Sequence, residues 1–515
     1  MGLVTGDRVV MILPTTLEGI YVIEACKRLG IIYACMPSSL PAQSLADRVE
    51  DTGAKLLIVS GRSGSSLGME ITSDYYSVSD LLSRLDALGL SESEAQRLHG
   101  ALEGNITVSS EFLQQVVPSV LLDDIIASCK MGTRVRVISD EDLTNNLAVP
   151  RTPTEPLCFK SLVPVEANFP LFIIYTSGTT GKPKGIVHAH GYLGGVMMTM
   201  QSSFDAIPGR DVALVLASFG WITGQSYMIA GCLANRVTTV ITQANPVSPY
   251  VARFAAIIQR FNVSILKGGV AFLKYVMSQH KGIEELSKYD LSSLKVGTFC
   301  AEPSSPVVQL FAMQHITPHY INSYWGTEHG GMVLSCSYGN VDQPLKADTT
   351  MYNYPWIAFQ AWISTDDEES GSAHRQVTGQ DDPGEAVITA PWPYMARTTW
   401  GDASRIGHSG WMGDIERFKS TYFSRFNQPV FFQGDVAVSY GGGRFSLHGR
   451  SDDVLNVNGH RVGTGQIEAS ILRDKLRPDS PIGNCIIVGV EDEMTGQTPW
   501  AFVTLMPGSK FLPAD

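Results

Sequence analysis

No run of like charge, no Cys-x-x-Cys pair and no basic, apolar leader occurs in this 515-residue chain. Its eight cysteines have no regular spacing, so we expect neither a disulfide framework nor a zinc site, and we expect an intracellular, reducing setting, the cytoplasm. A net charge of −12 without a basic tail argues against nucleic acid as a partner. The opening MGLVTGDRVVMILP carries Asp7 and Arg8 before a very short apolar run, so we do not expect a signal peptide.

One segment has the length of a membrane span, because residues 212–234 hold no charged side chain. Polar residues interrupt it, among them Ser218, Thr223 and Gln225. Such interruptions are typical of a strand, a turn and a helix inside a folded protein. We therefore expect a buried strand and helix here and no membrane span.

Apolar strands alternate with helical spacing from the start of the chain, which predicts an α/β protein. The first unit is a parallel βαβαβ arrangement with strands at 9–13, 31–36 and 55–60 and helices at 15–29 and 41–51. We expect its first strand at or near the edge of the sheet, with upstream sequence missing. Residues 62–165 show no clear period, and we expect short helices and loops there.

A second alternating region predicts a second doubly wound layer, with strands at 171–175, 212–217, 237–242, 263–267 and 296–300. From residue 356 the spacing shortens to strands and turns, ending in a hairpin at 436–448 around three glycines, which predicts a small β-rich subdomain. A fresh αβ pattern follows Asp452. We therefore divide the chain into a large region, 1–451, and a partial mobile region, 452–515.

The most specific local feature is Thr-Ser-Gly-Thr-Thr-Gly-Lys-Pro-Lys-Gly at 176–185, directly after an apolar strand. Its glycines let the backbone approach an anion, and its hydroxyl and lysine side chains can surround phosphate oxygens. It is not the common NTPase loop, because only two residues separate Gly178 from Gly181 and a proline follows Lys182. The predicted phosphate-binding residues are Thr176, Ser177, Gly178, Thr179, Thr180, Gly181, Lys182 and Lys184.

Residues 175–185 resemble the signature loop of the adenylate-forming (AMP-binding) superfamily, which includes acyl-CoA synthetases, peptide-synthetase adenylation domains and firefly luciferases. Further blocks follow in the family's order, at 301–303, 322–331, 432–435 and 449–464. The stretch Gly-Trp-Ile-Thr-Gly at 220–224 is similar to the short-chain acyl-CoA synthetases typified by acetyl-CoA synthetase. The resemblance implies two doubly wound αβ subdomains, a small β-rich subdomain and a partial αβ C-terminal domain.

The resemblance also implies roles for individual residues in activating a carboxylate with ATP and Mg²⁺, with coenzyme A as the second substrate. Thr327 would hold the α-phosphate, Arg461 would reach the phosphates, and Glu328 would bind the magnesium ion. Asp435 would accept hydrogen bonds from the ribose hydroxyls. The adenine and ribose site would further include Ala301, Glu302, Pro303, Asn322, Tyr324 and Arg450, and Asp452 would be the hinge between the two regions.

Substrate size would be set by Trp325, which closes the acyl pocket in this subgroup. Together with Ile222, Thr223 and Cys300 it would leave room for a few carbons, so the small-molecule partner would be acetate or propionate. Some positions depart from the family pattern: Gly326 stands where the family has a glutamine, and Asn322 where it has an aspartate.

The family's catalytic lysine has no counterpart, since neither Lys475 nor Lys510 has the surrounding pattern. We therefore expect both ends to be truncated and activity to be impaired. The alternative is a protein that binds nucleotide or acyl adenylate without turnover. A peptide-synthetase adenylation module is disfavoured by Trp325. No residue pattern indicates an oligomeric state.

Overall fold

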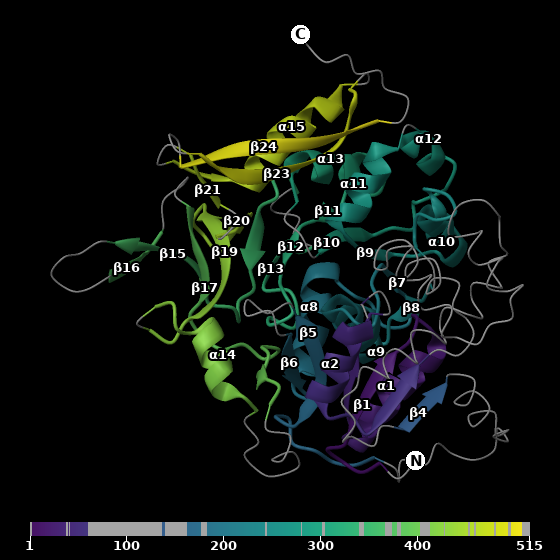
Figure 1. The fold of residues 1–515 in the computed structure, drawn as a ribbon. Helices are drawn as coiled ribbons and strands as arrows, with labels where there is room; N and C mark the ends of the chain where they lie inside the picture. The colour runs from purple at the N-terminus through teal and green to yellow at the C-terminus, as the bar shows by residue number, and fades with distance from the viewer. Residues whose placement is uncertain are drawn as a thin grey trace, which may run out of the picture.

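Four sheets and their covering helices make up the part of the chain that the computed structural model describes (Figure 1). The described residues are 3–37, 40, 42–59, 136–139, 162–176, 183–242, 245–279, 281–300, 304–338, 345–365, 373–377, 383–401, 413–426, 428–451, 454–457, 460–477, 480–492 and 496–506. Most of residues 62–165, where we expect short helices and loops, lie outside the described residues. So do residues 177–182 of the predicted phosphate loop and the 301–303 block.

The first sheet has seven strands, and its parallel centre is the predicted βαβαβ unit. Helix α1 (Leu17–Leu29) begins where the Thr16 side chain accepts a hydrogen bond from the Gly19 amide and ends at Gly30, whose φ of 65° suits glycine. Helix α2 (Ala42–Thr52) leads to the next strand. The strand order is β18 (Thr398–Thr399), β6 (Lys184–Ala189), β5 (Pro170–Thr176), β2 (Ile32–Cys35), β1 (Arg8–Ile12), β3 (Leu56–Val59) and β4 (Arg136–Ser139).

Two expectations about this sheet are wrong. Strand β1 pairs with β2 on one side and β3 on the other, so it lies inside the sheet and not at its edge. Strand β5, which we had assigned to the second layer, pairs with β2 through Tyr33 and Phe172 and belongs to the first sheet. Most of the first sheet is therefore formed before the second begins, and β18 is added to its edge after the second sheet is complete.

The second sheet has five parallel strands and confirms the expected second αβ layer. Its order is β11 (Tyr320–Ile321), β10 (Val296–Cys300), β9 (Ile265–Gly269), β7 (Val212–Val215) and β8 (Thr238–Val240). The associated helices are α8 (Tyr192–Phe204), η2 (Gly224–Ala230), α9 (Gly231–Ala234), α10 (Arg253–Phe261), α11 (Val270–Ser278), α12 (Gly282–Leu286) and α13 (Pro306–His315). Residues 212–234 form strand β7, a turn, the buried helix η2 and the half-buried helix α9, which confirms the expected strand and helix. Among the described residues no helix is long and apolar enough to cross a membrane.

The third sheet has eight antiparallel strands and confirms the β-rich region. Its order is β12 (Ser323–Tyr324), β13 (Leu334–Ser335), β14 (Met351–Asn353), β20 (Arg444–Arg450), β19 (Phe431–Ser439), β17 (Pro383–Ile388), β15 (Phe359–Thr365) and β16 (Ala373–Gln376). The predicted hairpin is β19 and β20, and helix α14 (Ile415–Tyr422) precedes β19. One continuous apolar core joins the first three sheets, with Val9, Ala213 and Phe431 among its buried members. Their shared core brings the ends of strands from all three sheets together.

The fourth sheet follows residue 452 and lies at the top of Figure 1. Its order is β22 (His460–Gly463), β21 (Val454–Val457), β24 (Gly496–Leu505) and β23 (Ile482–Asp492), with helix α15 (Thr464–Leu472) and the short helix η4 (Arg473–Leu476) packed beside it. It confirms the predicted αβ pattern. Lys274 of α11 lies 4.0 Å from Glu468 of α15, so this sheet contacts the second layer.

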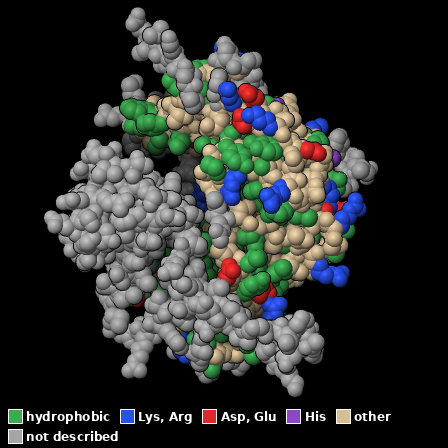
Figure 2. All heavy atoms as spheres, turned by 90° about the vertical axis from the view of Figure 1, so that its right-hand side faces the viewer, with side chains coloured by type: hydrophobic (Ala, Val, Ile, Leu, Met, Phe, Trp, Pro, Cys, Tyr) green, Lys and Arg blue, Asp and Glu red, His purple; other side chains and the backbone are tan. Residues whose placement is uncertain are grey.

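The surface on the right-hand side of Figure 1 mixes side chains of every kind. On the part of this face that the structure describes, Figure 2 shows Lys and Arg side chains scattered between apolar ones and not gathered into a single patch.

Candidate active site

The predicted phosphate loop connects two antiparallel strands. Strands β5 and β6 pair so that Thr176 lies opposite Lys184. These two residues are therefore the ends of the connection, and residues 177–182 between them lie outside the described part of the chain. Tyr175, next to Thr176, donates a hydrogen bond to Asp51 of α2 at 2.6 Å, which fixes the first end of the loop to a helix.

Lys184 points toward helix α14. Its amino group donates to the Tyr422 hydroxyl at 3.3 Å and lies 5.1 Å from the centre of that ring. Burial lowers the pKa of Lys184, and the nearby Glu328 carboxylate opposes that shift. The second end of the loop therefore presents a cation beside an acidic residue.

Both carboxylate oxygens of Glu328 receive hydrogen bonds from the protein. The Tyr422 hydroxyl donates to Oε1, and the Gln433 amide donates to Oε2 at 2.8 Å. Glu328 is 5% exposed and Tyr422 is 3% exposed, so this carboxylate is held in one orientation inside the protein. Burial, followed by the charge of Glu328, raises the pKa of Tyr422, which keeps its hydroxyl a donor.

Two buried histidines hold the turn that carries Thr327 and Glu328. His188 Nε2 lies 2.8 Å from the Thr327 carbonyl oxygen, and the Gly326 amide donates to His329 Nδ1 at 2.9 Å. Burial lowers the pKa of His188 to about 4 and that of His329 to about 3. Both rings are therefore neutral at pH 7, and His188 donates from Nε2 to the carbonyl.

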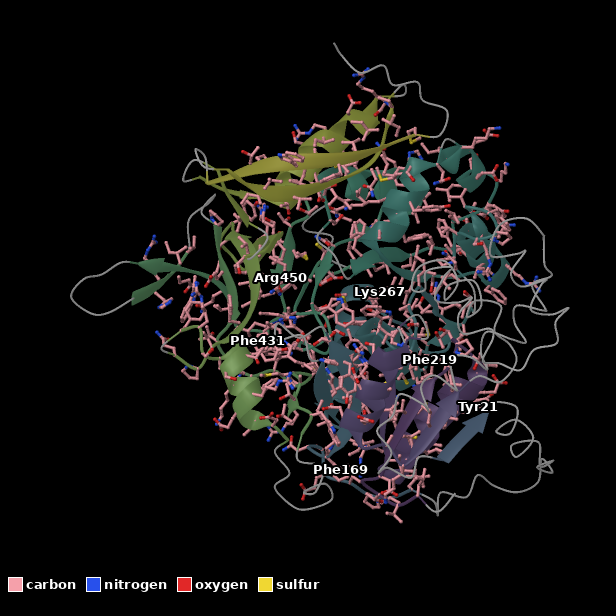
Figure 3. All side chains as sticks on the ribbon, viewed as in Figure 1. Tyr21, Phe169, Phe219, Lys267, Phe431 and Arg450 are labelled. Carbon is pink, nitrogen blue, oxygen red and sulfur yellow. The ribbon has the colours of Figure 1, made fainter. Side chains whose placement is uncertain are left out.

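The predicted ribose site lies beside this turn. The Tyr324 hydroxyl donates to Asp435 Oδ2 at 2.5 Å, and Asp435 pairs with Arg450 across strands β19 and β20. Arg450 Nη1 donates to the Gln433 carbonyl oxygen at 2.7 Å. Figure 3 shows Arg450 near Phe431, at the side of the third sheet that faces the second layer. Gln433, two residues before Asp435 on strand β19, thus contacts Arg450 through its carbonyl oxygen and Glu328 through its side chain.

Three of the predicted acyl-pocket residues are buried, and one of them, Trp325, packs against a tyrosine. Ile222, Thr223 and Trp325 are at most 8% exposed. The Tyr227 ring on helix η2 meets the Trp325 ring edge to face, with 4.9 Å between ring centres. The side chain of Cys300, the fourth predicted member, lies outside the described residues.

Other predicted residues divide into two groups. Asn322 is described, and its amide is used within the protein: it donates to the Thr349 carbonyl at 2.9 Å and accepts from the Ser323 amide at 3.0 Å. The residues of the second group lie outside the described part wholly or by their side chains: Ser177, Gly178, Thr179, Thr180, Gly181, Lys182, Ala301, Glu302, Pro303, Asp452 and Arg461.

Tyr422, Gln433, His188 and His329 were not predicted from the sequence, although they hold the predicted residues in place. Two of them had a visible signal, because Gln433 directly precedes Gly434 and Asp435, and His329 directly follows Glu328. His188 had none.

A separate cavity of about 1200 Å³ opens on the other side of helix α14. Phe418 of α14 and Phe423 at its end line the cavity, as do Tyr192 at the start of α8 and Trp392 in the segment before β18. None of the predicted site residues lines it. Helix α14 therefore contributes Tyr422 to the candidate site and two phenylalanines to this cavity.

Comparisons with known proteins agree on one family for this chain. The family described as AMP-binding enzyme matches residues 1–395. Acetyl-coenzyme A synthetase of Mycolicibacterium smegmatis is 32% identical over 520 residues, which cover 98% of this chain and 47% of that protein. Acetyl-coenzyme A synthetase of Cupriavidus pinatubonensis is 31% identical over 520 residues, which cover 98% of this chain and 68% of that protein. The chain thus spans about half of the first relative and about two thirds of the second.

Among solved structures, the anthranilate CoA ligase AuaEII in complex with anthranoyl-AMP has a similar fold. The TM-score is 0.70, and the match covers 99% of this chain and 79% of that chain. At 17% identity this likeness concerns the fold alone.

Proposed function

Since this chain belongs to the AMP-binding enzyme family, we propose that it uses ATP to activate a short-chain carboxylate, acetate or propionate, and transfers the acyl group to coenzyme A. The observation that carries the proposal is the connected set of side chains from Lys184 through Tyr422 and Glu328 to Gln433. It joins the end of the predicted phosphate loop to the strand that carries Asp435. A single nucleotide can therefore contact both.

The first step is attack of a carboxylate oxygen on the α-phosphorus of ATP. The new oxygen–phosphorus bond forms as the bond to pyrophosphate breaks, so anions must be brought together and their charge offset. Lys184 supplies a cation at the loop, and Thr327 supplies a hydroxyl on a turn that His188 holds. In the second step the thiol of coenzyme A attacks the acyl carbonyl and AMP leaves.

The ribose would be held by Asp435, since a carboxylate can accept hydrogen bonds from two hydroxyls at once. The Tyr324 hydroxyl already holds this carboxylate on one side, and Arg450 supports the same strand pair. Tyr324 also offers an aromatic ring beside the sugar for stacking on adenine.

Glu328 fits the role of a magnesium ligand. Among the described residues no group of three or more His, Cys, Asp or Glu side chains converges, so a metal cage made by the protein alone is not present there. Mg²⁺ needs no such cage, because it commonly binds one or two carboxylates and completes its shell with phosphate oxygens and water. When bound, the ion would offset charge on the phosphates. Tyr422 and Gln433 would keep the Glu328 carboxylate turned toward it.

The size of the acid is proposed from Trp325. Its indole is 8% exposed and packs edge to face against Tyr227, so it would be a rigid wall of the acyl pocket that Ile222 and Thr223 would also line. Such a wall admits a methyl or ethyl group and excludes longer chains.

The test combines nucleotide binding with acid-dependent chemistry. Calorimetry should detect binding of ATP in the presence of Mg²⁺. Exchange of labelled pyrophosphate into ATP should then require acetate or propionate, with benzoate as the negative control. Binding without exchange would favour the alternative, a protein that holds nucleotide or acyl adenylate without turnover. Absence of ATP binding would contradict both.

A further inference from the structure

Helix α2 packs on the strands that the predicted phosphate loop connects. Leu45, Ala46 and Val49 of α2 share an apolar core with Ile173 of β5 and Val187 of β6. This core is distinct from the larger one that joins the first three sheets. The helix therefore lies against the first sheet beside the two ends of the loop (Figure 1).

The last turn of α2 holds the residue at the first end of the loop. The Tyr175 hydroxyl donates to Asp51 Oδ2 at 2.6 Å and lies 2.9 Å from the Thr52 hydroxyl oxygen. The guanidinium carbon of Arg48 lies over the Tyr175 ring, 5.8 Å from its centre, which is a cation–π distance. Burial, followed by the charge of Asp51, raises the pKa of Tyr175, so its hydroxyl stays protonated and remains a donor.

The same turn of α2 also holds the second end of the loop, through Trp400. The Trp400 indole donates to the Asp51 carbonyl oxygen at 2.9 Å, and the Trp400 amide donates to the Gly185 carbonyl oxygen at 2.6 Å. Gly185 follows Lys184 and lies opposite Tyr175 in the sheet. A methyl group at residue 185 would lie 2.9 Å from Trp400 Cβ and 3.2 Å from Tyr175 Cε1, so these residues are tightly packed. Asp51 is thus connected to both ends of the loop.

The alternation of side chains along a strand gives the two faces of the sheet different roles here. Successive side chains point to opposite faces. Because Tyr175 points to α2, Thr176 points to the other face, as does Lys184, which lies opposite Thr176. On that face Lys184 reaches Tyr422 of the candidate site. The face toward α2 therefore anchors the loop, and the opposite face presents it to the proposed nucleotide.

Asp51 occupies an unfavourable position for the helix itself. It is the next-to-last residue of α2, and the last turn of this helix has no basic side chain. The helix dipole is negative at this end, so a carboxylate is disfavoured there and a Lys or Arg would be preferred. The contact with Tyr175 accounts for the carboxylate better than the stability of α2 does.

We infer that Asp51 is a positioning residue for the phosphate loop, which holds the ends of the loop where it can meet the β- and γ-phosphates of ATP. This inference rests on the proposed function and adds to it. Asp51 acts through Tyr175 and itself contacts no nucleotide. Since AMP has neither of these phosphates, the hydrogen bond between Asp51 and Tyr175 should matter for ATP binding and not for AMP binding.

The test compares the dissociation constants of ATP and AMP, measured by calorimetry in the presence of Mg²⁺. The variants are Tyr175→Phe, Asp51→Ala, Asp51→Asn and the double variant Tyr175→Phe/Asp51→Ala. Asparagine removes the charge of Asp51 but keeps an oxygen that can accept from the Tyr175 hydroxyl. The matched control is Tyr21→Phe, which removes a hydroxyl from a tyrosine on α1 that is 56% exposed.

For Tyr175→Phe and for Asp51→Ala we expect ATP affinity to fall about 3- to 10-fold, as for the loss of one hydrogen bond, and AMP affinity to stay the same. The double variant should match Tyr175→Phe, because both single variants break the same bond. Asp51→Asn should lose less ATP affinity than Asp51→Ala, and Tyr21→Phe should lose none. Losses that are equal for ATP and AMP, that add in the double variant, or that are absent from Asp51→Ala would each overturn the inference.

Binding by the natural chain separates this inference from the proposed function. If the natural chain binds neither ATP nor AMP, the proposed function fails. If it binds both, and the ratio of the two dissociation constants is the same in every variant, only the positioning role of Asp51 fails.

Discussion

Gln433 donates its side-chain amide to Glu328 at 2.8 Å, across 105 positions of the chain. This bond joins strand β19, which carries Asp435, to the turn that carries Thr327. Glu328 also accepts from Tyr422, so residues from three separate segments meet at one carboxylate.

Replacing Tyr422 by phenylalanine should weaken the response to magnesium. The variant keeps the ring, which stacks on Phe431, but loses the hydroxyl that orients Glu328. Loss of such a supporting group typically lowers metal affinity about 10-fold. We expect the Mg²⁺ concentration needed for half-maximal ATP binding to rise by about that factor, while affinity for metal-free AMP is unchanged. Tyr440→Phe, which removes a hydroxyl that pairs with Ser446 elsewhere, is the control.

Gly326→Ala should also disturb the hydrogen bonding of the Glu328 carboxylate, in this case by displacing the Gln433 amide. A methyl group at residue 326 would lie 2.8 Å from Gln433 Nε2, so the amide must move away from Glu328. Since the end of a long side chain moves easily, thermal stability should change little, whereas Mg²⁺-dependent ATP binding should weaken.

The double variant Gly326→Ala/Gln433→Ala checks this route. If the methyl group acts only by displacing the amide, the double variant should match Gln433→Ala alone. Additive losses in ATP binding would show that residue 326 acts in another way.

Asp435→Ala should weaken ATP and AMP binding alike. Each proposed ribose hydrogen bond to the carboxylate is worth about 1.5 to 3 kcal/mol, so loss of one should lower affinity about 10- to 100-fold and loss of both by more than about 100-fold. Glu416→Gln changes a carboxylate that is 82% exposed on α14 and should have no effect on either nucleotide. Equal affinities for the natural and Asp435→Ala chains would remove the ribose assignment.

Acid should destabilise the fold through its buried histidines. Burial lowers the pKa of His188 to about 4 from an ordinary value near 6.5, so the unfolded chain takes up a proton at a pH where the folded chain does not. The free energy of unfolding therefore falls as pH drops from about 6.5 toward 4, by about 2 kcal/mol at pH 5 for one such group.

His188→Gln should reduce the slope of the free energy of unfolding against pH, because the glutamine amide can still donate to the Thr327 carbonyl but does not titrate. His319→Gln, at an exposed position, should leave the slope unchanged. Urea unfolding at several values between pH 7 and 5 measures both. An unaltered slope in His188→Gln would contradict the assignment of a neutral, buried ring.

Sequence patterns predicted the elements well but not their neighbours. Helix α1 was predictable because its cap Thr16 and its stop Gly30 lie next to its apolar face. The central position of β1 was not, because parallel strands carry the same apolar pattern wherever they lie in a sheet. The pairing of β5 with β2 was missed for the same reason.

The candidate site likewise combines residues that the sequence predicts with residues that it does not. Asp435 and Glu328 lie in motifs that can be recognised from a few consecutive residues. Tyr422 lies 94 positions from Glu328, and nothing in the local pattern indicates that they meet. Supporting residues of this kind depend on how the layers pack, so they become visible only in the folded chain.

The common core of the first three sheets has a mechanical consequence for the ligand. Lys184 belongs to the first sheet, Asp435 belongs to the third, and Trp325 packs on a helix of the second. An adenylate that touches all of them acts as a brace across three layers. Because separation of any of these three layers would break contacts with it, a bound adenylate would raise the free energy of unfolding.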